Sequence, residues 1–108
     1  MIDLLKDKQP EIAAFCQHYR IRKLEVFGSA ATGAFNPESS DIDFLVDLGE
    51  YDDSVADRYL DLAIALEALL GRSIDLITTR AIKNPYFQVS VNRHRETVYD
   101  AGDRQAAA

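Results

Sequence analysis

The sequence predicts an α+β fold in which a small mixed β-sheet of about four strands carries helices packed on one face. Two segments place apolar residues at helical spacing, and three short segments alternate apolar with polar residues. Glycine and proline turns separate these segments. The expected order is therefore helix, strand, short helix, strand, helix, strand, helix and strand.

The composition is that of one soluble domain. The 108 residues are expected to form a single domain over residues 1–108, with a frayed tail at about 103–108. The formal charge of −6 argues against direct nucleic-acid binding, which needs basic clusters. No apolar stretch approaches the ~20 residues of a membrane span, and no signal peptide is evident at the start. The single cysteine fits a reducing compartment, so we expect a cytoplasmic protein.

The first expected helix has an apolar face. Its residues recur at helical spacing and are Ile12, Phe15, Cys16 and Tyr19. Proline is tolerated in the first turn of a helix, so we expect Pro10 to begin a new helix after a short turn at residues 4–8. Cys16 is interpreted as a core residue and not as a reactive thiol, because free cysteines are usually buried.

Three strands follow at residues 22–27, 41–48 and 73–78. In the first strand, Leu24 and Val26 should point to one face and Glu25 to the other. Between the first two strands, Gly33 favours a short helix or tight turn at 29–35, and the Asn36-Pro37 turn leads into the second strand.

A longer helix is expected between the second and third strands. Ser54 or Asp53 is the expected N-cap, and Gly71 is the expected C-terminal stop. The apolar stripe that should face the core comprises Val55, Tyr59, Leu62, Leu66 and Leu69. A last helix should begin near Asn84-Pro85, and Thr97-Val98-Tyr99 favours a fourth strand.

The most informative feature is a group of aspartates in the expected strands. Asp41 and Asp43 face the same side of their strand with Cα atoms ~6.6 Å apart, while the apolar residues between and after them face the other side. Asp75 has the same phase, since Ile74 and Leu76 flank it. If the second and third strands are neighbours, the three carboxylates converge.

Three close carboxylates repel one another unless a cation lies between them. Magnesium is the usual cation, with oxygen ligands and substrate phosphates, and two ions ~3.5–4 Å apart could clamp an in-line phosphoryl displacement. Gly28 would let the backbone approach a phosphate, and Ser29 would add a hydroxyl. An Asp-x-Asp or a Gly-Ser alone is common and is usually a solvated strand end, but the combination favours a nucleotide site.

At these residues the chain resembles a known family. Gly28-Ser29, then Asp41-Ile42-Asp43 after eleven residues, and Asp75 later resemble the motifs of the polymerase-β-like nucleotidyltransferases. The small size resembles the minimal nucleotidyltransferases of bacteria and archaea, including the MntA-type antitoxins. The resemblance covers about residues 22–99 closely and the first helix loosely.

The resemblance implies a palm-like sheet that binds ATP and Mg²⁺. Asp41, Asp43 and Asp75 would be the catalytic and metal-binding carboxylates, with Asp75 as the expected general base. Gly28 and Ser29 would hold the β- and γ-phosphates. In the antitoxin branch, AMP is transferred to a tyrosine hydroxyl of a partner HEPN ribonuclease toxin, pyrophosphate leaves, and the toxin is silenced.

One position departs from the family pattern. Many members read Gly-Ser-x-Ala-Arg-Gly, whereas Thr32 stands here where the arginine is expected. The missing guanidinium removes a possible phosphate or partner contact, and Lys83, Arg93 and Arg95 are the candidates to replace it.

Three functions therefore stay open at the level of the sequence. The first is an active antitoxin enzyme that adds AMP to its toxin. The second is a non-catalytic antitoxin that acts by binding and occlusion, which Thr32 favours and the three aspartates disfavour. The third is the catalytic subunit of a two-component nucleotidyltransferase that acts on a small molecule.

Overall fold

The sheet has four strands with β3-β2-β1-β4 as their spatial order. The computed structural model describes residues 2–28, 41–79 and 95–102. The strands are β1 (Lys23–Phe27), β2 (Ile42–Asp47), β3 (Ile74–Thr78) and β4 (Arg95–Asp100). The pairs β1–β2 and β1–β4 are antiparallel, and β2–β3 is parallel, so the sheet is mixed as predicted.

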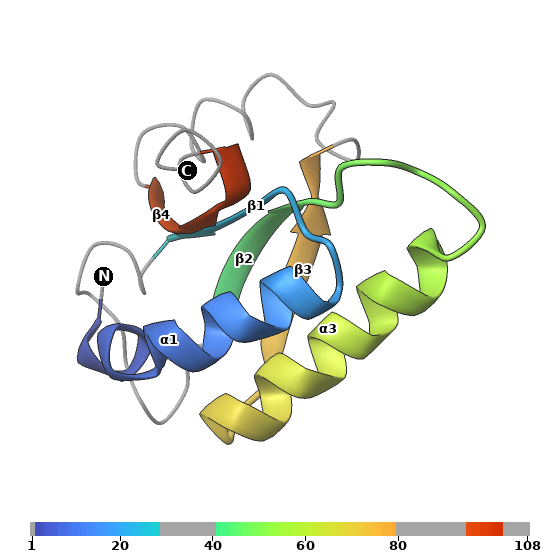
Figure 1. The fold of residues 1–108 in the computed structure, drawn as a ribbon. Helices are drawn as coiled ribbons and strands as arrows, with labels where there is room; N and C mark the ends of the chain where they lie inside the picture. The colour runs from blue at the N-terminus through green and yellow to red at the C-terminus, as the bar shows by residue number, and fades with distance from the viewer. Residues whose placement is uncertain (1, 29–40, 80–94, 103–108) are drawn as a thin grey trace.

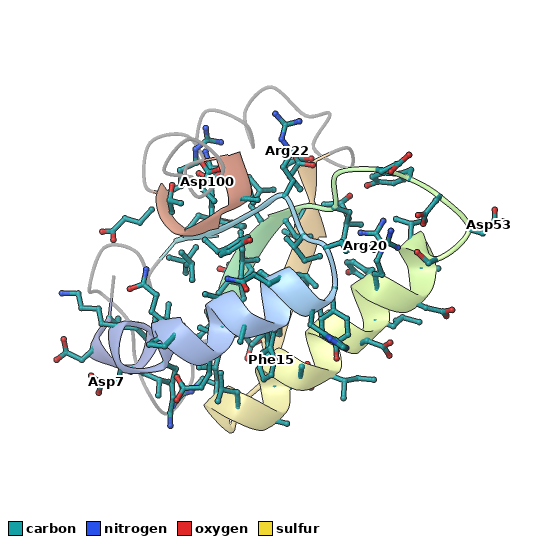
Figure 2. All side chains as sticks on the ribbon, in the orientation of Figure 1. Asp7, Phe15, Arg20, Arg22, Asp53 and Asp100 are labelled. Atoms are coloured by element: carbon teal, nitrogen blue, oxygen red, sulfur yellow. The ribbon has the colours of Figure 1, made fainter. Side chains whose placement is uncertain are left out.

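Two helices, α1 (Asp3–His18) and α3 (Val55–Leu70), lie side by side across one face of the sheet (Figure 1). Phe15 lies between them (Figure 2). The core between helices and sheet combines apolar residues of both, among them Ile12, Leu24, Phe44 and Leu62. The expected strand phase is confirmed, because Leu24 and Val26 are fully buried in this core. In the described part of the chain, neither helix is long and apolar enough to cross a membrane.

The prediction that Pro10 begins a new helix is wrong. Pro10 lies inside α1, which runs without interruption from Asp3. Proline removes one backbone hydrogen bond from a helix interior. Leu5 and Ile12, on either side of Pro10, are both fully buried in the same core, so one continuous helix buries both of them.

The start of α3 also differs in detail from the expectation. Ser54 occupies the N-cap position, but its hydroxyl makes no capping bond to the helix. The hydroxyl instead donates to Asp52 and accepts from Arg20, which reaches toward this end of α3 (Figure 2). At the other end Gly71 stops the helix in the left-handed conformation, as predicted.

The short helix expected at 29–35 and the helix expected near Asn84-Pro85 lie outside the described residues. The fourth strand is confirmed, and it is longer than expected because it begins at Arg95. A bulge between Leu24 and Glu25 shifts the β1–β4 register, which leaves Val98 as the extra residue.

Candidate active site

The pairing of β2 with β3 brings the predicted carboxylates together. In the parallel register, Asp43 lies directly beside Asp75. Asp41 is the residue immediately before β2, at the same end of the sheet. The condition stated from the sequence, that the second and third strands are neighbours, is therefore met. Asp43 and Asp75 lie at the beginnings of β2 and β3, where hydrogen bonds between the two strands fix the backbone, and Asp41 lies just before β2.

Asp43 is the carboxylate whose ionisation this arrangement disfavours. The pKa of Asp43 is raised from 3.8 to about 6, first by burial, then by a hydrogen bond with Asp75, and then by the charges of Asp75 and Asp41. Asp43 is half-buried, whereas Asp41 and Asp75 are exposed. The site thus concentrates negative charge that a bound cation would relieve.

The chemistry of this donor set fits a magnesium ion, although the side chains do not form a closed cage. Among the residues that the structure describes, no three acidic, histidine or cysteine side chains are arranged to hold a metal as they lie. Magnesium is usually bound by one or two carboxylates together with substrate phosphates and water, so a closed protein cage is not required. Asp43 with Asp41 and Asp75 supplies oxygen donors of that kind.

Gly28 borders the same carboxylates from β1. Because β1 and β2 are antiparallel, Phe27 pairs with Asp43, and Gly28 follows at the site end of the sheet. Gly28 has a φ of 70°, and a Cβ placed on it would lie 3.1 Å from Oδ2 of Asp43. Glycine is needed here both for its conformation and for the close approach of the backbone to a carboxylate. Ser29 and Thr32 lie outside the described residues.

Sequence reasoning missed two charged residues that the fold buries. Glu25 is 6% exposed on the sheet face that carries Asp43, and its carboxylate pairs with Arg95 at 3.0 Å. Strand alternation placed Glu25 on that face, but only the pairing with β4 explains its burial. Of the proposed substitutes for the missing arginine, Arg95 is described, whereas Lys83 and Arg93 lie outside the described residues.

The second missed residue is Arg58, at the end of the sheet opposite the carboxylates. Its guanidinium donates to the backbone oxygens of Leu48 at 2.9 Å, Tyr19 at 3.3 Å and Glu50. Arg58 precedes Leu62 by four residues, so it shares the buried face of α3. It fastens the loop after β2 to the end of α1, a structural role that no local pattern indicates.

Comparison with known proteins places the chain among nucleotide-transferring proteins. The profile of the nucleotidyltransferase domain family matches residues 11–98. A protein of Methanocaldococcus jannaschii, named as a candidate protein adenylyltransferase, is 38% identical over 88 residues, which are 82% of this chain and 77% of that protein. The protein adenylyltransferase MntA of Thermococcus cleftensis is 34% identical over 83 residues, 77% of this chain and 78% of that one.

Solved structures agree with the fold. A candidate minimal nucleotidyltransferase superposes with a TM-score of 0.72 at 30% identity, covering 88% of this chain and 95% of the other. A chain from the complex of a tri-AMPylated HEPN toxin with an MNT antitoxin, from Shewanella oneidensis, superposes with a TM-score of 0.62 at 16% identity. That match covers 95% of this chain and 78% of the other, and at this identity it supports the fold alone.

Proposed function

Because this chain belongs to the nucleotidyltransferase domain family, we propose that it transfers AMP from ATP to a tyrosine hydroxyl of a partner HEPN ribonuclease toxin and so silences the toxin. The observation that carries the proposal is the register that sets Asp43 beside Asp75, next to Gly28. The names of its relatives, which include a protein adenylyltransferase MntA, support the choice of AMP and of a protein acceptor. The tri-AMPylated toxin in the Shewanella oneidensis complex supports the class of partner.

The reaction assigns a separate task to each residue. The tyrosine oxygen attacks the α-phosphorus, an O–P bond forms, the bond from the α-phosphorus to the bridging oxygen breaks, and pyrophosphate leaves. Asp75 accepts the hydroxyl proton, and its exposed position supports this task because a hydroxyl on another protein can reach it. Magnesium, as one or two ions held by Asp41, Asp43 and Asp75, would neutralise phosphate charge. Gly28, with Ser29, binds the phosphates.

The place of β3 supports a large acceptor. In the described sheet β3 is an edge strand, with β2 on one side only. Asp75 is therefore accessible from the side of β3 that no described strand covers, where a toxin surface can complete the site. A chain of this size encloses little on its own, so the acceptor should supply part of the binding surface.

The test uses ATP labelled in the α-phosphate, magnesium and the purified partner toxin. Wild-type protein should label the toxin, and Asp43→Asn and Asp75→Asn should label it at least about 100-fold more slowly, the range expected for loss of a general base. Asp7→Asn, an exposed acid on α1, is the matched control and should retain the rate. Absence of label from the wild type, with transfer restored by Thr32→Arg, would contradict activity of the natural sequence.

Occlusion without chemistry is the second candidate, and Thr32 in the arginine position favours it. The double variant Asp41→Ala, Asp43→Ala separates the two functions in cells that express the toxin. Loss of protection supports AMP transfer, whereas full protection supports occlusion.

A further inference from the structure

The sheet face opposite the helices carries a row of ion pairs that ends at the candidate active site. Arg95 Nε lies 3.0 Å from Oε2 of Glu25. Lys23 Nζ lies 4.0 Å from the other oxygen of Glu25 and 3.9 Å from Asp100 Oδ2. Acidic and basic groups thus alternate along the row, and Arg95 is its last member on the side of Gly28.

Glu25 is the unusual member of this row. Its side chain is 8% exposed, and burying a carboxylate is costly unless it is paired. The Arg95 side chain is 38% exposed. The ion pair involves Nε of the guanidinium, so it restrains the direction of the group while part of the side chain remains at the surface. We therefore interpret the buried Glu25 as a residue that positions the guanidinium of Arg95, in addition to any contribution to stability.

The strand register places Arg95 beside the phosphate-binding turn. Phe27 pairs with Asp43 on one side and with Arg95 on the other, and residues directly opposite one another share a face of the sheet. Neighbouring strands lie ~4.8 Å apart, so the Cα atoms of Arg95 and Asp43 lie ~10 Å apart across β1. Gly28 follows Phe27 between them.

The strand order then matches the order of groups in an in-line displacement. The attacking and leaving oxygens must lie on opposite sides of the α-phosphorus. If the acceptor lies beside Asp75 on β3 and the α-phosphate lies beside Asp43 on β2, the leaving pyrophosphate would point across the end of β1 toward β4, given the strand order. Arg95 stands at that end of the axis, and a guanidinium binds phosphate oxygens in a bidentate manner.

We propose that Arg95, oriented by Glu25, binds the terminal phosphates of the nucleotide and balances the charge of the departing pyrophosphate. This inference rests on the proposed function, because it assigns a new residue to the same site. Arg95 supplies from β4 the guanidinium that the sequence lacks at Thr32. Glu25 is a positioning residue, since it acts through Arg95.

The test compares the affinities of Arg95→Ala and wild type for a non-hydrolysable ATP analogue and for AMP, by calorimetry with magnesium present. The analogue should bind about 10-fold or more weakly to the variant, the loss expected for a charged hydrogen bond, while AMP affinity stays unchanged. Arg95→Lys should recover part of the affinity for the analogue. Glu25→Gln should weaken analogue binding to an intermediate degree, again without effect on AMP.

Arg22→Ala is the matched control, because Arg22 is a 73% exposed arginine that lies 3.9 Å from Asp47 at the other end of β2. It should leave both affinities unchanged. Arg95→Ala leaves the buried Glu25 carboxylate without its closest partner, so the double variant Arg95→Gln, Glu25→Gln is measured as well. It removes both charges and should still lose the analogue selectively.

Equal weakening of AMP and analogue, or unchanged analogue affinity in a folded variant, overturns the inference and leaves Arg95 and Glu25 as a structural pair. Failure of the proposed function has a different signature. If the wild type binds the analogue but transfers no AMP to the toxin, the proposed reaction fails, while the Arg95 inference is still decided by the affinity ratio. A wild type that binds neither nucleotide overturns both.

Discussion

Replacing Asp43 with asparagine should stabilise the metal-free protein at neutral pH, although it removes a residue that the proposed reaction needs. The carboxyl of Asp43 has a pKa of about 6 in the folded protein instead of 3.8, because it is partly buried and faces Asp75 and Asp41. Asparagine has nearly the same shape and no charge. The substitution therefore removes the repulsion without opening a cavity.

The sign follows from the direction of the pKa shift. A carboxyl whose pKa is raised by folding contributes stability below pH 3.8, and this contribution is lost as the pH rises through about 6. The full difference between these two pKa values corresponds to a free energy of about 3 kcal/mol. Solvent screening at a half-exposed carboxylate reduces this to about 1 kcal/mol, so Asp43→Asn should gain about 1 kcal/mol at pH 7 and nothing near pH 3.5.

Urea unfolding in EDTA at both pH values measures this gain, and a gain of 1 kcal/mol should raise Tm by about 4–8 °C in a domain of this size. Asp7→Asn serves as the control, since Asp7 points away from the body of the protein on α1 (Figure 2). Adding magnesium should stabilise the wild type more than Asp43→Asn. An equal gain at both pH values, or no gain at pH 7, would refute the idea that clustered charge destabilises the site.

Three further substitutions or treatments test other parts of the structure. Gly28→Ala should lower the free energy of unfolding, measured in urea, by about 2 kcal/mol and should slow AMP transfer. Gly71 has a similar φ of 68° but open space where a Cβ would lie, so Gly71→Ala should lower the free energy of unfolding by about 1 kcal/mol. Equal losses would exclude the contact with Asp43 as a cause. Arg58→Met should lower the free energy of unfolding by about 3 kcal/mol or more, because it leaves backbone oxygens without their donor. The nucleotide affinity of the folded variant should not change. Cys16, whose pKa burial raises to about 12, should react with a thiol reagent at pH 8 only as fast as the protein opens, and a fast reaction of the folded protein would disagree with its burial.

Much of the site could be predicted because strand periodicity is local. Asp41, Asp43 and Asp75 could be assigned to one face from the residues that flank them. Their convergence depended on β2 and β3 being neighbours, which the sequence left as a condition and the topology meets. The roles of Ser29 and Thr32 stay predictions, since neither residue is described.

The sequence-based predictions are wrong or incomplete where contacts between distant parts of the chain determine the local structure. Local rules place Pro10 at the start of a helix, but the core that contains Leu5 and Ile12 favours one continuous helix. The burial of Glu25 depends on Arg95, 70 positions later, which only the β1–β4 pairing brings beside it. Arg58 looks like an ordinary charge on a helix until the loop after β2 folds over its guanidinium.

The central claim is that a tyrosine of the toxin receives AMP and that pyrophosphate is released. The most direct measurement incubates the protein and its toxin with magnesium and ATP labelled either in the α- or in the γ-phosphate. We predict that the α-label is found on the toxin, in a tyrosine-containing peptide, that the γ-label is found in pyrophosphate, and that Asp43→Asn abolishes both. Toxin that is silenced without carrying any α-label, or that carries the γ-label, would contradict the account.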